Sequence, residues 1–231
     1  MKPLSEYIKR LAAEVHKDTN FAYWKERIEK KYGLTPLIGP GVDNPFWILR
    51  EIDSIFSPVP ERLIRACGLN TLVLRADMGP NRPYYPNHGY FVDNRVVLNA
   101  DIFCHPDQPD DFFDFHGYFL TRPQQTLLHE IGHAYDAHNG DLSLKDNWLE
   151  LSGWNREKAP GLERLVIRDP GAPEVIGEWY FNPKAEFTRF YAKRNPWDDF
   201  ADSFSFYVAG MKNKVPPKKC AYFDDLLKKY Y

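Results

Sequence analysis

The sequence is poor in cysteine, and the few cysteines it has lie far apart. Its three cysteines, Cys67, Cys104 and Cys220, are odd in number and show no metal-binding spacing. This argues against a disulfide framework and leaves no metal motif built from thiolates, so reduced thiols are expected. The sequence also lacks an excess of charge of either sign, because its 30 Lys and Arg nearly balance its 32 Asp and Glu, for a net charge of −2. Without a basic run or basic helix face, neither nucleic acid nor a membrane surface is expected as a partner.

Long hydrophobic runs are missing as well. The first twenty residues are polar and charged, and no later run approaches the about 20 apolar residues of a membrane-spanning helix. A cytoplasmic protein is therefore expected by default, and an effector or toxin exported by a specialised machine would have the same features. The sequence gives no indication of an oligomeric state. Its 231 residues, with 43% hydrophobic and 27% charged, are typical of a globular protein with one core.

We expect one domain over residues 1–231, with an α+β fold. Its parts are a helical N-terminal region (about 1–66), a small mixed or antiparallel sheet with a central helix (about 67–140), and a mainly helical remainder (about 141–231). Periodicity predicts helices over 4–15, 21–31, 47–56, 60–66, 195–210 and 222–229, and strands over 70–75, Gly89–Val92 and Arg95–Asn99. The last two strands are expected to pair across a turn at Asp93 and Asn94. Connecting loops are expected over 36–45, 79–86, 101–117 and 155–177.

The most informative stretch is His129-Glu130-Ile131-Gly132-His133, inside an apolar run compatible with a helix. Residues four apart share one face of a helix, so both imidazoles are expected to point to one spot, as in half of a zinc site. Glu130 would project about 100° around the helix, within reach of a water on the metal, where a general base belongs. An incidental pair of histidines is the alternative. The buried face around the motif and the start and stop signals at the two ends of the run favour the zinc-binding helix.

A catalytic zinc usually takes three protein ligands, so a third is needed. A metzincin would carry Gly and His where this chain has Asp136 and Asn139, which excludes that arrangement. Asp136 is better placed to accept a hydrogen bond from a liganding imidazole. Weaker candidates for the third ligand are Glu150, which would be a thermolysin-style carboxylate, and then Glu178, Glu186 and His138.

The stronger candidate lies on the helix predicted after Asn195. Asp198 and Asp202 are four apart and share one face, where two carboxylates repel each other unless a cation lies nearby. Asp198 would bind zinc while Asp202 accepts a hydrogen bond from an imidazole. In the alternative reading, Asp198 stands three residues after Asn195 and closes a capping box at the helix start. The two roles do not wholly exclude each other.

The HExxH motif, combined with a second segment, resembles the zincin peptidases related to anthrax lethal factor and the Pro-Pro endopeptidases. That second segment is Tyr191-Ala192-x-x-Asn195-Pro196-x-Asp198-Asp199-Phe200-Ala201-Asp202-x-Phe204. The resemblance covers about residues 127–206. Those families have a Glu ligand in a Glu-x-Phe-Ala-Glu segment and a tyrosine seven residues before it, which corresponds to Tyr191 here. Both acids are Asp in this chain, so the second helix has to sit closer to the metal, or Asp199 has to take over as ligand.

The resemblance implies a zincin-like fold and a zinc-dependent endopeptidase acting on a peptide or protein. His129, His133 and Asp198 would hold Zn²⁺, and Glu130 would activate water on it. Tyr191 would donate its hydroxyl to the oxyanion, and the strand near Arg95–Asn99 would be an edge strand that aligns the peptide. Two alternatives remain open at this point: a zinc hydrolase of a non-peptide amide, and an inactive zinc-binding interaction protein.

Overall fold

The structure, a computed structural model, describes residues 20–76, 88–104, 120–168 and 175–231. The expected helix over 4–15, the expected loop over 79–86 and most of the loop over 101–117 lie outside these ranges. Within them the fold is α+β, as expected, with two small sheets and a majority of helix. Among the described helices, none is both long enough and apolar enough to cross a membrane.

The first sheet has four strands in the order β1-β2-β4-β3. They are β1 (Thr35–Ile38), β2 (Thr71–Arg75), β3 (Gly89–Val92) and β4 (Arg95–Asn99). β1 and β4 both run parallel to β2, whereas β3 runs antiparallel to β4. The β3–β4 hairpin is confirmed: its turn residues have positive φ, 47° at Asp93 and 59° at Asn94, as a two-residue type I′ turn requires. β1 lies in a stretch expected to be a loop, and its Pro36 is tolerated because β1 ends the described sheet.

The expectation that Arg95–Asn99 forms an edge strand is wrong. β4 is flanked by β2 on one side and β3 on the other, so β3 is the end strand of the described sheet. A strand whose residues 96–99 are all buried is better suited to this interior place than to an edge.

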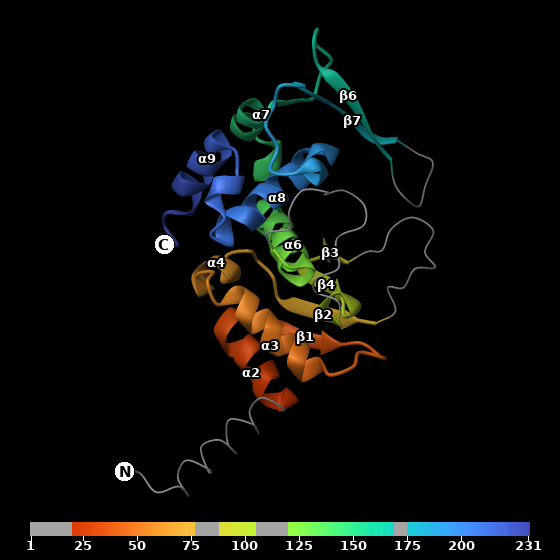
Figure 1. The fold of residues 1–231 in the computed structure, drawn as a ribbon, viewed down its shortest axis with the longest axis vertical. Helices are drawn as coiled ribbons and strands as arrows, with labels where there is room; N and C mark the ends of the chain where they lie inside the picture. The colour runs from red at the N-terminus through yellow and green to blue at the C-terminus, as the bar shows by residue number, and fades with distance from the viewer. Residues whose placement is uncertain (1–19, 77–87, 105–119, 169–174) are drawn as a thin grey trace, which may run out of the picture.

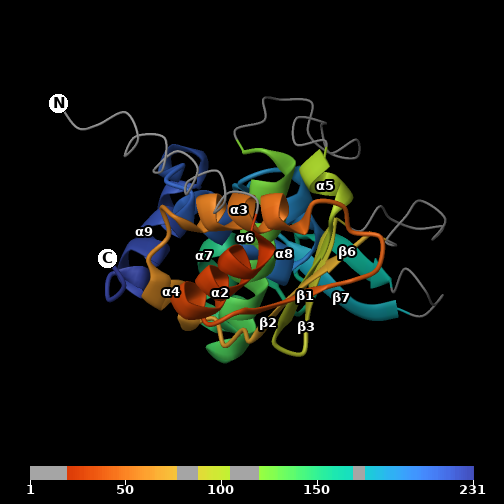
Figure 2. The same cartoon turned by 90° about the horizontal axis from the view of Figure 1, so that it is seen from below.

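Helices cover both faces of this sheet. α2 (Phe21–Tyr32), α3 (Pro45–Phe56) and the short α4 (Glu61–Arg65) lie on one side, and α6 (Arg122–His138) lies on the other (Figure 1). Figure 2, seen from the side of α2 and α3, shows them in front of α6. A one-turn helix, α5 (Asp101–Cys104), follows β4 where a loop was expected.

The second sheet occupies the segment expected to be a connecting loop. β5 (Trp154–Asn155), β6 (Glu163–Arg168) and β7 (Val175–Phe181) pair antiparallel in the order β5-β7-β6, preceded by the short η1 (Leu142–Leu144) and α7 (Asp146–Ser152). This sheet has its own small apolar cluster, built around Leu149, Trp154 and Trp179. The apolar run Leu165-Val166-Ile167, with β-branched Val and Ile, is a strand signal that the predicted loop overlooks.

The C-terminal part contains η2 (Phe190–Arg194), α8 (Pro196–Val208), η3 (Lys212–Lys214) and α9 (Pro217–Leu227). α9 begins at Pro217, five residues before its expected start at 222, because proline is well tolerated in the first turn of a helix. The main hydrophobic core runs from Trp24 in α2 to Leu227 in α9, so the N-terminal and C-terminal parts share one interior. α6 and α8 cross at the centre of this core (Figure 1).

Candidate metal centre

Local sequence fixes the start of α6 and the face it buries. The Thr121 side chain accepts from the Gln124 backbone N–H, and the Gln124 side chain accepts from the Thr121 N–H at 3.0 Å, a complete capping box. From this start, His129 and His133 fall on one face of the helix, next to α8. The His129 side chain is 6% exposed and that of His133 is 21% exposed, so the pair lies at the boundary between core and solvent.

α8 brings the carboxylate to this face. The Asn195 side chain caps the helix by accepting from the Asp198 backbone N–H at 2.7 Å, and its amide donates to Asp198 Oδ2 at 2.7 Å. Phe200 and Phe204 are fully buried on the other side of the helix and fix its rotation. The two roles weighed for Asp198 therefore occur together: its backbone and Oδ2 belong to the cap, and its Oδ1 faces the histidines.

The two helices approach closely at Gly132 and Ala201. A Cβ atom on Gly132 would lie 2.8 Å from the Ala201 Cα and 3.0 Å from its carbonyl oxygen, which is too close for any side chain. Ala201 lies one turn after Asp198 on α8, and Gly132 lies one residue before His133 on α6. This contact brings α8 close to the histidine face of α6, so that the short side chain of Asp198 reaches the two imidazoles.

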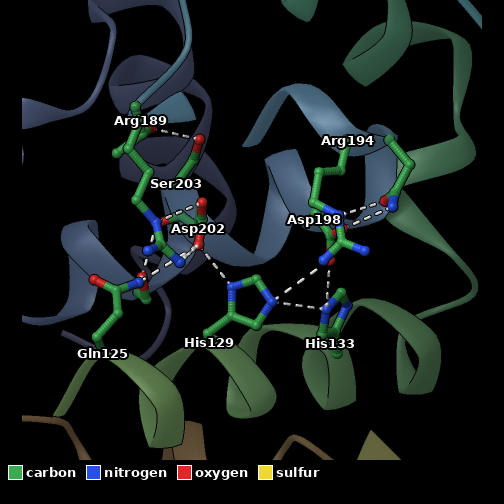
Figure 3. A network of polar contacts seen from close by, with 11 residues as sticks. Gln125, His129, His133, Arg189, Arg194, Asp198, Asp202 and Ser203 are labelled. Atoms are coloured by element: carbon green, nitrogen blue, oxygen red, sulfur yellow. Dashed lines mark hydrogen bonds and ion pairs between the residues drawn. The ribbon is translucent and has the colours of Figure 1, made fainter. Parts of the chain in front are cut away.

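Three donor atoms converge between the helices (Figure 3). His129 Nε2 lies 3.0 Å from His133 Nε2 and 3.6 Å from Asp198 Oδ1, and His133 Nε2 lies 3.3 Å from the same oxygen. A tetrahedral zinc with donors at about 2.05 Å holds them about 3.3 Å apart, so the three separations bracket the value expected for one ion. Two imidazoles and one carboxylate are also a donor set that zinc accepts in catalytic sites. The residues fit a zinc ion.

The pKa shifts of His129 and Asp198 also indicate that a positive charge is favoured between the three groups. Burial lowers the pKa of His129, but the charges and hydrogen bonds of Asp202 and Asp198 outweigh it and raise the pKa to about 10. Burial raises the pKa of Asp198, yet its hydrogen bonds to His129 and His133 hold the pKa well below the usual range. The carboxylates around the two imidazoles therefore favour a positive charge at this point, which suits a bound cation.

Asp202 lies directly behind His129. Its Oδ1 is 2.7 Å from His129 Nδ1, and the side chain is fully buried. This is the arrangement expected of a carboxylate that fixes the tautomer and the ring plane of a metal-binding histidine. Arg189 donates to both oxygens of Asp202, from Nε at 2.8 Å and from Nη2 at 2.7 Å, and Gln125 donates to Oδ1 at 3.4 Å. Sequence reasoning missed Arg189 and Gln125, because neither belongs to a spaced motif.

Glu130 is 7% exposed, on the side of α6 that packs against β3. Burial is the main cause that raises its pKa, while the charges of His129 and His133 and a backbone hydrogen bond from Phe91 oppose this rise. A carboxyl group with a raised pKa, beside the two histidines and outside the donor set, is suited to accept and return protons.

Tyr191 lies in η2, beside the histidines. Its ring is 5.5 Å from the His129 ring in an edge-on arrangement, and the guanidinium carbons of Arg189 and Arg194 lie 4.9 and 4.6 Å from the ring centre. Burial is the main cause that raises the pKa of its hydroxyl, followed by the negative charge of Asp198. The hydroxyl therefore keeps its proton at neutral pH and remains a hydrogen-bond donor.

Asp136 lies in the last turn of α6. Its oxygens accept from the Ser143 backbone N–H at 2.7 Å and from the Ser143 hydroxyl at 2.6 Å, so it closes the turn after α6 and makes no described bond to an imidazole. Burial raises its pKa, which these bonds counteract. The described bonds of Asp136 therefore go to Ser143 on η1, and its expected role in orienting a histidine stays a prediction.

Asp199 and the other carboxylates considered as the third ligand lie away from the donor set. Asp199 points into the core, where it accepts from Lys219 Nζ at 2.6 Å and from Trp154 Nε1 at 3.0 Å, and burial raises its pKa to about 6. Glu150 and Glu186 are exposed, and Glu178 pairs with Arg164 on the second sheet. His138 is exposed and packs against Gly68 at the end of α6. None of them joins His129 and His133 in a donor group among the described residues.

Comparisons of the sequence with protein-family models and with curated proteins give no match.

Proposed function

We propose that this protein is a zinc-dependent endopeptidase of the zincin type. The observation that carries the proposal is the convergence of His129, His133 and Asp198 on one point, with Glu130 buried beside them but outside the donor set. A purely structural zinc site has no need for such an acid, because it is closed by a fourth protein ligand. The motif resemblance to the lethal factor-like peptidases supports the same reading, as does α6 packed on a sheet with an antiparallel end strand.

Bound zinc would polarise a substrate carbonyl and lower the pKa of a coordinated water towards about 7. In this scheme Glu130 takes a proton from the attacking water and later delivers it to the departing amine. Its burial favours the protonated form, so the carboxyl group accepts the proton readily, and the backbone hydrogen bond from Phe91 favours its release again. Asp202 holds the Nδ1–H of His129, so that Nε2 presents its lone pair towards Asp198 and His133.

β3 is the strand proposed to align the substrate. Asn99 donates to the His88 carbonyl, which makes 88 and 99 a hydrogen-bonded pair and directs the backbone groups of Gly89 and Phe91 away from β4. Phe91 also contributes the backbone hydrogen bond to Glu130. An extended peptide added along this edge would therefore pass next to the general base, as in β-strand addition.

Tyr191 is proposed to donate to the oxyanion that forms on the attacked carbonyl. Its hydroxyl keeps its proton, and its ring is held beside His129 by two arginines. A donor placed in this way stabilises the charge that develops in the transition state more than the ground-state carbonyl.

The test is incubation of the zinc-loaded protein with a peptide library, followed by mass spectrometry of new termini. We expect cleavage at internal peptide bonds, lost when a chelator removes the metal and recovered when zinc is added back. A protein that binds zinc but cleaves only non-peptide amides would replace the peptidase assignment with that of another zinc hydrolase. A protein that binds zinc and hydrolyses nothing would leave it as a zinc-binding protein.

The identity of the third ligand is tested by two matched variants. Asp198→Ala removes the buried oxygen that faces both histidines, so zinc per chain should fall to a small fraction of the wild-type value. Glu150→Ala removes an exposed carboxylate outside the donor group and should leave the zinc content unchanged. The reverse pattern would show that the carboxylate is misassigned.

A further inference from the structure

The strongest unexplained contact near the site is the fork between Arg189 and Asp202 (Figure 3). Nε and Nη2 of one guanidinium donate to the two oxygens of one carboxylate, at 2.8 and 2.7 Å. Such a bidentate pair fixes the plane of the carboxylate as well as its position. Oδ1 of the same carboxylate lies 2.7 Å from His129 Nδ1, so the orientation of that imidazole depends on the fork.

The charge of Arg189 is needed where it lies. Asp202 is fully buried, and a buried carboxylate without a nearby positive charge is costly. Once His129 is neutral, as a metal-binding imidazole must be, Arg189 is the cation that remains in the fork with Asp202.

Arg189 reaches the site from a segment separate from both helices. It precedes η2, and its neighbour Thr188 is tied to α8 by a hydrogen bond between Thr188 Oγ1 and Ser203 Oγ at 2.9 Å. The same guanidinium lies 4.9 Å from the centre of the Tyr191 ring, which in turn contacts His129. One side chain therefore holds both groups that flank this imidazole.

We propose that Arg189 is a positioning residue of the metal centre. It fixes the orientation of His129 through a bidentate hydrogen bond to Asp202, and it holds the ring of Tyr191 beside that imidazole. This inference rests on the proposed zinc site. It requires the guanidinium fork and not only a positive charge, because a lysine ammonium cannot bond both oxygens in one plane.

The test measures metal binding in the full chain, with zinc alone and with cobalt(II) alone as probes. Competition with a chelator gives the zinc Kd, and the visible absorption of cobalt(II) reports the geometry of its ligands. We expect the zinc Kd to rise about 10- to 100-fold in Arg189→Ala, which is the usual effect of removing an outer partner of a metal-binding histidine. Arg189→Lys keeps the charge and protects folding, yet it should show a raised Kd and an altered cobalt spectrum as well.

The matched control is Lys219→Met. It breaks the buried pair of Lys219 and Asp199, which ties the same helix α8 to α9 but takes no part in the group of donor atoms. It should lower the unfolding temperature without changing the zinc Kd or the cobalt spectrum. The proposal is overturned if Arg189→Ala binds both metals as the wild type does, if Arg189→Lys restores wild-type binding, or if Lys219→Met has the same effect. Wild-type protein that binds zinc without hydrolysing peptides would contradict the proposed function alone, and wild-type protein that binds no zinc would contradict both.

Discussion

Gly132→Ala tests whether the spacing of α6 and α8 is what allows Asp198 to serve as the proposed ligand. The new Cβ would lie 2.8 Å from the Ala201 Cα and 3.0 Å from its carbonyl oxygen. Carbon contacts are optimal at about 3.5–4.0 Å, so α6 and α8 would have to separate by about 1 Å. Metal donors tolerate errors of only about 0.2 Å, and Asp198 lies on the helix that moves. We therefore expect the zinc Kd to rise at least about 10-fold, or about 1.4 kcal/mol.

The loss in the free energy of unfolding of the same variant should be small, because two effects of opposite sign partly cancel. Overpacking costs about 1–3 kcal/mol, and alanine gains about 1 kcal/mol over glycine within a helix. A net loss of up to about 2 kcal/mol lowers the unfolding temperature by up to about 8 °C in a chain of this size. Gly177→Ala is the control, because nothing lies within 4 Å of its added Cβ.

The decisive result is the double variant Gly132→Ala with Asp198→Glu. Glutamate is longer by one carbon–carbon bond of about 1.5 Å, which is close to the expected widening. Each single change should weaken zinc binding, and the pair should bind zinc more tightly than either one, as measured by chelator competition. Additive losses, or a Gly132→Ala protein with wild-type zinc affinity, would refute the explanation by helix spacing.

Three further results are expected. Tyr191→Phe should keep the zinc and lower kcat about 10²- to 10³-fold with little change in KM, as measured by peptide hydrolysis, because an oxyanion donor acts mainly in the transition state. Lys219→Met leaves the buried Asp199 without its ammonium partner and should cost about 3–5 kcal/mol in the free energy of unfolding, as measured in urea. Cys67 is 1% exposed and burial raises the pKa of its thiol, so a thiol reagent should modify the exposed Cys104 in the native protein and reach Cys67 only after unfolding.

The parts of the site that sequence could predict are those encoded by spacing along one helix. The four-residue separation of His129 and His133 placed both rings on one face, and the same spacing placed Asp198 and Asp202 together. Asn195 marked the start of α8 through its side chain, where the structure has the cap. The positive φ values at Asp93 and Asn94 show why that dipeptide was a reliable hairpin signal.

The parts that sequence did not predict depend on contacts between distant segments. Arg189 meets Asp202 only because the segment before η2 folds back along α8, and a single arginine carries no periodic signal. Asp136 is expected to bond an imidazole because it follows one turn after a histidine, but in the structure its carboxylate accepts hydrogen bonds from Ser143. The order of strands was equally hidden, since pairing of β4 with both β2 and β3 is a property of the whole sheet.

The most direct test of the central claim compares the wild type with Glu130→Gln at equal zinc load. Glutamine keeps the size of the side chain and removes its ability to take a proton, while His129, His133 and Asp198 remain in place. The account predicts one zinc per chain in both proteins and a loss of peptide hydrolysis, measured as kcat, of about 10²-fold or more in the variant. Equal kcat values in the two proteins, or a wild type that binds no zinc, would contradict it.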